Sequence, residues 1–476
     1  MTMHTDMLVI GGGMAGFCAA LELAEAGREV LLLEKMHYTG GSSAMSGGCL
    51  ALAGTSLQKK NGIKDSDELL TQDLREVGQQ EGDESLIKAY VDNQLETYDW
   101  LCARGVQFSP MVSTLSGQSV PRAHALDPAD TIRLLEARCK ATGKVTVMLS
   151  ARAERFVYNE SAARIEAVRV QMPSGTQTVT VSGKVILASG GFCQDKEMVR
   201  RFAPHYAEAV FVGGAGNVGD GLRMAWKLGA DVRDMAHIKG TYGKHPVDMT
   251  NDHSCLAAYK GAVIVNQEGS RYVDESISYK LLGDACMAQS DHTSYQVFDQ
   301  PIFDSGDDRV AILDFNRRLE QGTLLKADTL QELAQMIDIP YNILKATLDT
   351  YNSYVDAGHD PDFGRKALVH HHGELVRVET GPFYAFPSTA VVFGTYCGLR
   401  IDPQMHVLDV FGDRIGGLLA AGEVVGGFHG GAYMTGTSLG KAAIFGRIAA
   451  KTALAESTAQ HQKQAAHPAG AAGVAV

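Results

Sequence analysis

A run of small residues near the start of the sequence, Gly11-Gly12-Gly13-Met14-Ala15-Gly16, has the spacing G-x-G-x-x-G. It follows a short apolar run and opens a segment of helical character, which is the context that a dinucleotide-binding turn requires. Gly11 permits the tight turn, Gly13 lets the backbone approach a pyrophosphate, and Gly16 allows the helix to pack closely on the strand. Phosphates then bind at the positive end of the helix, and Glu34, after the next strand, can accept hydrogen bonds from a ribose. The motif alone indicates a dinucleotide site and leaves NAD and FAD open.

Small residues in more distant segments favour FAD. Residues 39–48 are rich in glycine and serine, so the chain can lie close to an extended cofactor, and the apolar strand 185–188 leads into Gly190-Gly191. Near the C-terminus, the strand-like run 417–423 precedes residues 436–440, which open the last helix. The N-terminus of that helix can stabilise negative charge on a flavin pyrimidine ring. An ordinary NAD-binding domain does not need this returning segment.

These segments supply most of the predicted FAD site, and Lys35, Ala153 and Asp220 complete it. The residues expected to bind FAD are Gly11, Gly13, Met14, Ala15, Gly16, Glu34, Lys35, Gly40, Gly41, Ser42, Ser43, Ser46, Gly47, Gly48, Ala153, Ser189, Gly190, Asp220, Gly422, Glu423, Gly436, Ser438 and Leu439.

The elements that must position these residues indicate an α/β fold with a Rossmann-like FAD-binding domain. Residues 7–10 are apolar without polar alternation, as expected of a buried parallel strand. A helix at 14–26 and a second strand at 30–33 follow. Residues 145–190 predict antiparallel strands with a turn at 173–175. Further helices are expected at about 67–78, 84–105, 128–142 and 438–455.

The chain of 476 residues is too long for one compact core, so two domains are expected. Residues 236–375 lack a nucleotide motif and mix strands with helices, which predicts an α+β capping domain. Residues 1–235 and 376–460 then form a discontinuous FAD-binding domain. The tail is rich in alanine, glutamine, histidine and glycine, and we expect disorder over 461–476.

Composition excludes several classes of function. The formal net charge of -12 argues against a nucleic-acid surface. The sequence has no window of 18 uninterrupted apolar residues, so no membrane span is expected. The strand expected to begin at about Met7 leaves no room for a signal peptide. The eight cysteines are scattered without a CxxC pair, which is typical of reduced, mostly buried thiols in a cytoplasmic protein. The run His370-His371-His372 predicts a solvated loop, and no metal site is expected.

The FAD segments, together with residues 121–124 and 263–275, resemble the fumarate reductase and succinate dehydrogenase flavoprotein superfamily. The resemblance extends from residue 6 to about 455. It implies an FAD domain interrupted by a smaller capping domain, with the active site between them. The segment around residues 40–42 lacks the histidine to which succinate dehydrogenases attach their flavin, so we expect FAD to be bound non-covalently.

Two departures from the fumarate reductase pattern bear on the substrate. Fumarate reductases carry a proton-donating arginine where this chain has Tyr279, and they follow His-Gly with an Asn-Arg pair that binds a carboxylate. Here His429 matches the family's histidine, but no arginine follows it in residues 430–436. The loss of both arginines argues against a dicarboxylate, because carboxylates favour bidentate arginine. Tyrosines at these places resemble the 3-ketosteroid dehydrogenase branch and its cyclic-ketone relatives, and Tyr433-x-Thr435 looks most like the Δ4-(5α) enzymes.

The resemblance therefore implies α,β-desaturation of a ketone, or reduction of the corresponding enone, with a 3-ketosteroid or related cyclic ketone as substrate and an unknown electron acceptor or donor. Tyr279 is the expected base or acid, and Tyr433 and Thr435 are expected to polarise the carbonyl or relay the proton. A tyrosine with its ordinary pKa near 10 needs a neighbouring positive charge or hydrogen-bond donor to act as a base. Tyr242 is a further candidate to line the cleft. The alternative is a fumarate reductase-like enzyme that acts on an unsaturated carboxylate of the fumarate, urocanate or tricarballylate type.

Overall fold

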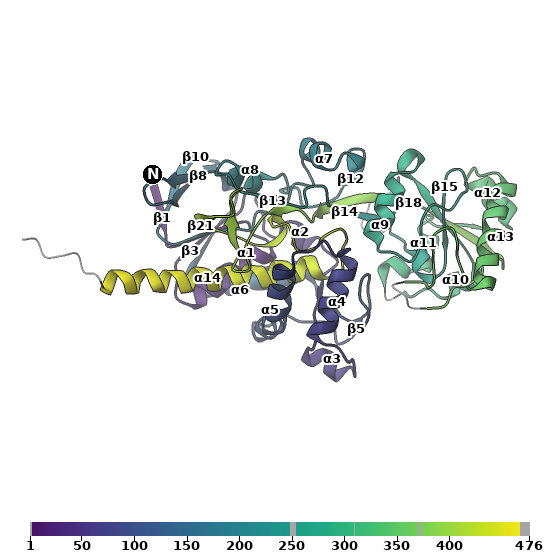
Figure 1. Ribbon diagram of the computed structural model, residues 1–476, viewed down its shortest axis with the longest axis horizontal. Helices are drawn as coiled ribbons and strands as arrows, with labels where there is room; N and C mark the ends of the chain where they lie inside the picture. The colour runs from purple at the N-terminus through teal and green to yellow at the C-terminus, as the bar shows by residue number, and fades with distance from the viewer. Residues whose placement is uncertain (1, 248–253, 309, 370–372, 467–476) are drawn as a thin grey trace, which may run out of the picture.

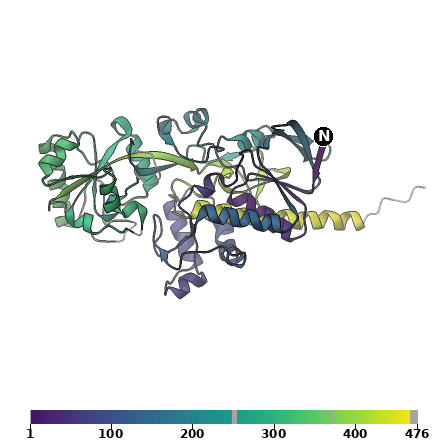
Figure 2. The same ribbon diagram turned by 180° about the vertical axis from the view of Figure 1, so that it is seen from behind.

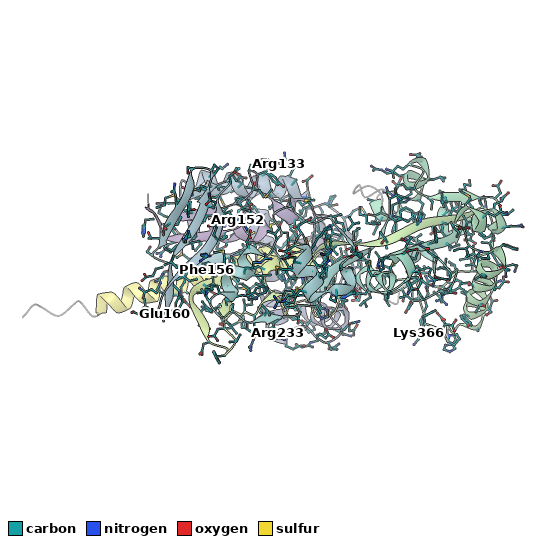
Figure 3. The ribbon with its side chains drawn as sticks, turned by 90° about the horizontal axis from the view of Figure 1, so that it is seen from above. Arg133, Arg152, Phe156, Glu160, Arg233 and Lys366 are labelled. Carbon is teal, nitrogen blue, oxygen red and sulfur yellow. The ribbon has the colours of Figure 1, made fainter. Side chains whose placement is uncertain are left out.

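The computed structural model describes residues 2–247, 254–308, 310–369 and 373–466. The ribbon has a larger and a smaller body joined by extended strands, and the N-terminal strand and the last helix, α14 (Thr437–Ala466), belong to the larger body (Figures 1 and 2). Seen from above, Arg152 lies on the larger body and Lys366 on the smaller one (Figure 3). The predicted loop His370–His372 lies outside the described residues.

A six-stranded, mostly parallel sheet forms the centre of the larger body, in the order β20-β21-β11-β2-β3-β7. In parallel pairing, β11 lies between β2 and β21, and β2 also pairs with β3. Because the carboxyl ends of parallel strands meet at one edge, the turns that follow these four strands lie close together. The α/β fold class is confirmed. The strands are β2 (Met7–Ile10), β3 (Val30–Leu33), β7 (Val145–Met148), β11 (Val185–Leu187), β20 (His406–Leu408) and β21 (Arg414–Ala420).

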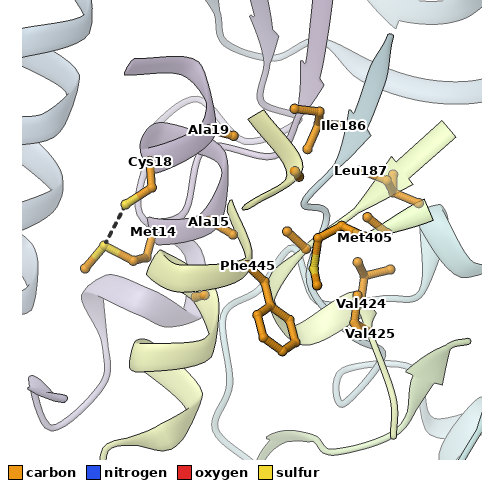
Figure 4. Packing of buried hydrophobic residues seen from close by; sticks show 14 of the residues in the cluster. Met14, Ala15, Cys18, Ala19, Ile186, Leu187, Met405, Val424, Val425 and Phe445 are labelled. Atoms are coloured by element: carbon orange, nitrogen blue, oxygen red, sulfur yellow. Dashed lines mark hydrogen bonds between the residues drawn. The ribbon is translucent and has the colours of Figure 1, made fainter. Parts of the chain in front are cut away.

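Two helices from opposite ends of the chain pack side by side in the core of this body. The first, α1 (Met14–Glu25), begins at the glycine-rich turn, and its Phe17 and Cys18 are fully buried. The second, α14, contributes Phe445 to the same core, where it lies with Met405, Val424 and Val425 (Figure 4). This packing fixes the N-terminal ends of both helices relative to the central sheet.

A second sheet of the larger body has the order β1-β10-β9-β8. The antiparallel pairing predicted for residues 145–190 is correct for β8, β9 and β10, and the turn at 173–175 joins β9 to β10. It is wrong for β7, which pairs in parallel with β3, and for β11, which pairs in parallel with β2 and β21; both belong to the central sheet. A four-residue apolar strand carries no signal that distinguishes the two kinds of pairing. The bounds are β1 (Thr2–Thr5), β8 (Arg152–Asn159), β9 (Arg164–Met172) and β10 (Gly175–Val181).

The smaller body, here called the cap, is built on β15, β16, β17 and the first half of β18. Their sheet, in the order β12-β18-β16-β15 with β14 and β17 also paired with β18, continues into the larger body, where β12 pairs with the second half of β18. The cap's own buried core includes Val263, Phe298, Leu344 and Tyr384. The strands of the whole sheet, across both bodies, are β12 (Val210–Phe211), β14 (Ile238–Lys244), β15 (Val263–Asn266), β16 (Ser294–Asp299), β17 (Leu325–Ala327) and β18 (Phe383–Thr395). The helices are α9 (Tyr279–Met287), α10 (Gln300–Asp304), α11 (Phe315–Glu320), α12 (Leu330–Met336) and α13 (Tyr341–Ala357).

The long strand β18 passes from the cap into the larger body (Figures 1 and 2). Its first half, Phe383 to Phe386, packs in the cap core, whereas Ala390 and Val392 pack in the core of the larger body. The cap core therefore includes residues that lie beyond the predicted boundary at 375, because β16 and β17 pair with this half of the strand. The assignment of 1–235 and 376–460 to one domain stays an interpretation.

The remaining elements of the larger body surround the central sheet. They are α2 (Gly41–Ala44), α3 (Ser56–Lys60), α4 (Asp67–Val77), α5 (Glu84–Ala103), α6 (Pro128–Ala141), α7 (Lys196–Phe202), α8 (Asp220–Trp226), and the short strands β4 (Cys49–Ala51), β5 (Val112–Ser113), β6 (Ala123–Ala125), β13 (Val232–Arg233) and β19 (Gly398–Leu399). None of the helices over the described residues is long and apolar enough to cross a membrane.

The last helix is longer than the sequence predicted. It continues to Ala466, whereas we expected it to end at about 455 and the chain to be disordered from 461. Alanine and glutamine, which dominate this stretch, are good helix formers, and the low-complexity pattern hid that propensity. Residues 467–476 lie outside the described part of the chain. All eight cysteines are free, and Cys102 is the exposed one among them.

Candidate active site

A cavity opens at the edge of the central sheet where the turns after β2, β3, β11 and β21 meet. It holds about 1490 Å³ of empty space, part of which is open to solvent. Residues from all three predicted segments line this one cavity. From the predicted FAD site they are Gly11, Gly13, Met14, Ala15, Glu34, Lys35, Gly40, Gly41, Ser42, Ser43, Ser46, Ala153, Ser189, Gly190, Asp220, Gly422, Glu423, Ser438 and Leu439.

The other predicted glycines, Gly16, Gly47, Gly48 and Gly436, do not line the cavity. A Cβ on Gly16 would lie 1.9 Å from the Gly11 oxygen, and one on Gly436 would lie 2.6 Å from the Ala51 nitrogen. A Cβ on Gly48 would lie 2.1 Å from the Leu126 oxygen, so these three glycines are required where backbone segments pack closely. Gly47 has nothing within 4 Å of its Cβ position, so packing does not require a glycine there.

The turn before α1 has the features of an anion site. Gly13 stands at the N-cap and offers no side-chain acceptor, and the Met14 N–H donates to Ser43 Oγ at 3.1 Å. Gly11 has a φ of 116°, and a Cβ there would lie 2.2 Å from the Ala188 oxygen. A helix N-terminus without a side-chain cap, at the wall of a cavity, binds negatively charged groups. This end of the cavity therefore fits a pyrophosphate.

Two carboxylates line the cavity close to this turn. Glu34 accepts hydrogen bonds from the backbone N–H of Gly12 at 2.9 Å and of Met36 at 2.8 Å. Its oxygens retain further acceptor capacity, as recognition of a ribose requires. Asp220 forms ion pairs with Lys35 and Arg152, both at 2.6 Å. Burial opposes ionisation of Asp220, but these two cations hold its pKa below the usual value.

Ser189 provides an independent test of whether the cavity fits a bound molecule. Its Oγ is buried and has no hydrogen-bond partner among the described residues, although the residue lines the cavity. Buried hydroxyl groups are almost always hydrogen-bonded, so a ligand oxygen or nitrogen beside Ser189 accounts for this one. The glycine-rich turn, Glu34 and the unpartnered hydroxyl of Ser189 together fit a dinucleotide such as FAD.

A buried group of charged and polar residues lies at another part of the wall. Glu423 accepts from the Thr395 N–H at 2.9 Å and from Asn217 Nδ2 at 2.7 Å. Burial nevertheless raises the pKa of Glu423. Lys441 Nζ donates to the Val425 oxygen at 2.9 Å, and burial lowers the pKa of Lys441 to about 8. These contacts account for both side chains without a ligand.

The three predicted catalytic residues come together where the cap meets the larger body. Tyr279 begins α9, and its hydroxyl lies 3.1 Å from Thr435 Oγ1, with either oxygen as donor. The Tyr279 and Tyr433 ring centroids are 6.0 Å apart. These residues do not line the cavity themselves, but His429 does, and its ring lies 5.5 Å from that of Tyr433. The tyrosine cluster, defined as Tyr279, Tyr396, Tyr433 and Thr435, thus adjoins the cavity.

The environment of Tyr279 favours its neutral form. Burial raises the pKa of Tyr279 well above its usual value, and neighbouring Tyr433 raises it further. The hydrogen bond from Thr435 opposes this only in part. The role of base would have required a neighbouring positive charge, and no cation is among the main causes of this pKa shift. Tyr279 is therefore protonated at neutral pH, which suits a proton donor.

Several residues of the site carried no strong signal in the sequence. Tyr396 stacks on Tyr433 with ring centroids 5.4 Å apart, and its buried hydroxyl has no partner among the described residues. Lys239 lines the cavity from β14, a segment with no motif. Asn217 follows the glycine-rich stretch 213–216, which could have revealed it. Tyr242, a candidate for the cleft, instead packs in the cap, where its hydroxyl lies 2.7 Å from Ser294 Oγ.

No group of three or more histidine, cysteine, aspartate or glutamate side chains with metal-binding geometry occurs among the residues that the structure describes. Histidine in this site has another character. Burial lowers the pKa of His429 well below its usual value, and Lys441 and Lys239 lower it further. The imidazole of His429 is therefore neutral next to the tyrosine cluster.

The FAD binding domain family matches residues 6–439 of this chain. Urocanate reductase of Eggerthella lenta is 31% identical over 468 residues, which cover 96% of this chain and 75% of that protein. Vinyl phenol reductase of Lactiplantibacillus plantarum is 30% identical over 480 residues, which cover 93% and 94% of the two chains. The solved structure of 3-ketosteroid Δ4-(5α)-dehydrogenase from Rhodococcus jostii RHA1 has a TM-score of 0.79 and 25% identity, and the match covers 95% of this chain and 97% of that one.

The comparison confirms the superfamily and the cofactor that the glycine-rich segments indicated. The match reaches from the first strand of the central sheet to the start of α14, so it includes all the residues that line the cavity except Lys441 and Ala442. The chain belongs to the FAD binding domain family, in the fumarate reductase and succinate dehydrogenase flavoprotein superfamily, and is an FAD-dependent oxidoreductase of the class that acts on carbon–carbon double bonds.

Proposed function

We propose that this protein reduces a carbon–carbon double bond conjugated to the carbonyl group of a ketone, with Tyr279 as the proton donor. The observation that carries the proposal is the buried, protonated Tyr279 hydroxyl at the junction of the cap and the larger body. FAD, when bound and reduced, supplies the hydride that the β-carbon gains. The α-carbon gains the proton of the Tyr279 hydroxyl. The hydride and the proton together add two electrons and two protons to the substrate.

The surroundings of Tyr279 support a proton transfer at a fixed position. Thr435 Oγ1 lies 3.1 Å from the Tyr279 oxygen and can return a proton to it. Thr435 is itself held at both backbone groups, because its N–H donates to the Ser116 oxygen at 2.8 Å and its carbonyl accepts from Gln118 Nε2 at 2.8 Å. Tyr433 is oriented by the Gly436 N–H, which donates to its hydroxyl at 3.1 Å. A general acid acts efficiently when its geometry is fixed in this way.

The polarity of the site supports a ketone rather than a dicarboxylate. The hydrogen bonds of Tyr279, Tyr433 and Thr435 are all made with neutral groups in the described part of the chain. Among the described residues that line the cavity, Arg152 is the one arginine, and it already forms an ion pair with Asp220. A dicarboxylate needs two cationic partners, for which arginine is the usual choice. An enone needs one polarised oxygen.

Reduction of an unsaturated monocarboxylate is the second candidate. The urocanate reductase that is 31% identical to this chain favours it, as does the presence of Lys239, a cation, in the cavity wall. In this reading the carboxylate would take the place of the ketone, and Tyr279 would keep its role.

An anaerobic acceptor screen tests the proposal. The holoenzyme, reduced with dithionite, is mixed separately with cyclohex-2-enone, 4-androstene-3,17-dione, urocanate and fumarate, and the return of oxidised flavin absorbance is followed. We expect an enone to give the fastest return. If only the carboxylates reoxidise the protein, the ketone assignment is wrong, and if none of the four does so, the conjugated-carbonyl class itself is refuted.

A further inference from the structure

Lys239 is a cation in the cavity wall that forms no ion pair among the described residues. It is the second residue of β14, where Ile238 and Gly240 on either side of it are buried, and its own side chain is half-buried at the wall of the cavity. Its partner across the strand pair is Gly394, which also lines the cavity. A Cβ at position 394 would lie 2.8 Å from Glu423 Oε1, so the Glu423 carboxylate borders the part of the cavity that lies next to Lys239.

The ammonium of Lys239 lies over an aromatic ring, and its charge also acts on Glu423, where it opposes the rise in pKa that burial causes. Nζ lies 4.3 Å from the ring centroid of Tyr433. A cation–π contact of this kind contributes about 0.5–2 kcal/mol but accepts none of the three N–H bonds of an ammonium. No hydrogen bond or ion pair of Lys239 occurs among the described residues. The cavity wall has two other lysines, and both have partners. Lys441 donates to the Val425 oxygen, and Lys35 forms an ion pair with Asp220.

This ammonium lies on the side of the cavity next to the proton donor. Tyr433, over which Nζ lies, is 6.0 Å from Tyr279 between ring centroids. His429, which lines the same wall, contributes no positive charge because burial keeps it neutral. Lys239 is therefore the cation available to a molecule that reaches from the cavity to the tyrosine cluster.

We propose that Lys239 binds the carbonyl oxygen of the substrate and stabilises the negative charge that develops there during reduction. The inference rests on the proposed function and deepens it, because it adds the group that polarises the carbonyl. As the β-carbon gains a hydride from the reduced cofactor, the π electrons move toward the oxygen. The ammonium keeps its protons and acts by charge and hydrogen bonding alone, while the α-carbon is protonated by Tyr279. One ammonium accommodates one conjugated oxygen, or one carboxylate, but not two.

The experiment uses the variants K239M and K239R, with K326M as a matched control. Lys326 is an exposed lysine of cap strand β17 whose Nζ lies 5.8 Å from the ring centroid of Tyr384, so K326M also removes a cation from a tyrosine ring. Each holoenzyme is reduced and mixed anaerobically with the acceptor that reoxidises the wild type fastest. We expect K239M to lower the second-order rate constant about 10²-fold, as loss of an oxyanion donor does, K239R to lower it less than about 10-fold, and K326M to match the wild type.

The midpoint potential of the bound flavin and the FAD content are measured in parallel. We expect both to be the same in K239M as in the wild type, because Lys239 contacts the substrate. A wild-type rate for K239M, or a slower rate accompanied by a shifted potential, would overturn the inference, and the shift would assign Lys239 to the cofactor. If K239M does not retain FAD, K239Q replaces it, and loss of FAD from both also assigns Lys239 to the cofactor. If a carboxylate is the only acceptor that reoxidises the wild type, the proposed ketone substrate is refuted. The role of Lys239 is then tested by the rate at which K239M reduces that carboxylate.

Discussion

The substitution Tyr279→Phe removes one oxygen atom from the centre of the tyrosine cluster. The hydrogen bond of 3.1 Å to Thr435 is lost, but the ring can keep its place 6.0 Å from Tyr433. A neutral hydrogen bond of this kind contributes about 0.5–1.5 kcal/mol to stability, so the variant is expected to fold. Loss of a general acid slows reduction by about 10²-fold or more, which corresponds to about 2.7 kcal/mol in the activation barrier.

The assay is the anaerobic reoxidation of the reduced holoenzyme by an enone, measured in a single turnover so that product release does not mask the chemical step. FAD content should be unchanged, because Tyr279 does not line the cavity. The control is Tyr242→Phe, which removes another buried tyrosine hydroxyl, one that lies 2.7 Å from Ser294 Oγ in the cap. Tyr242→Phe should reduce enones at the wild-type rate. If Tyr279→Phe also does so, Tyr279 is not the proton donor and the ketone assignment loses its main support.

Three further outcomes follow from the cavity and the cluster. The purified protein should be yellow with non-covalent FAD, so acid precipitation should leave FAD in the supernatant, and flavin in the pellet would contradict this. Ser189→Ala should weaken FAD binding by roughly 3- to 10-fold in a fluorescence titration, since it removes one hydrogen bond, and an unchanged affinity would exclude the hydroxyl as a ligand contact. Because the raised pKa keeps Tyr279 protonated, the rate of enone reduction should not decline through this group up to about pH 10, where a tyrosine with its ordinary pKa is half ionised; a decline by that pH that Tyr279→Phe abolishes would show that its pKa is not raised.

The cofactor part of the site could be predicted from the sequence because its signals are local. Gly11 to Gly16 are close in sequence, and the apolar run 7–10 before them predicts a buried parallel strand. The strand order that brings Gly422 to the same edge is not local, and only the resemblance to known flavoproteins supplied it.

The tyrosine cluster could not be predicted in this way. Tyr279 and Thr435 are 156 positions apart, and their contact depends on how the cap packs against the larger body. The resemblance implied that they share one site but left open whether Tyr279 acts as base or acid; burial, which favours its neutral form and supports the proposed acid, is a property of the folded chain. Lys239 and Tyr396 were missed because a single lysine or tyrosine in a strand is usually structural.

The passage of β18 through both bodies has a mechanical consequence. The connection between the cap and the larger body is not a pair of separate loops, because β14 and β18 run side by side as a hydrogen-bonded two-stranded ribbon between the bodies. Such a ribbon resists stretching but can twist, and its register shifts between Lys239 and Gly240 and again between Tyr242 and Lys244. Irregularities of this kind bend a ribbon and increase its twist. Any rotation of the cap therefore twists the strand pair that carries Lys239. The position of the Lys239 ammonium then changes with the angle between the cap and the larger body.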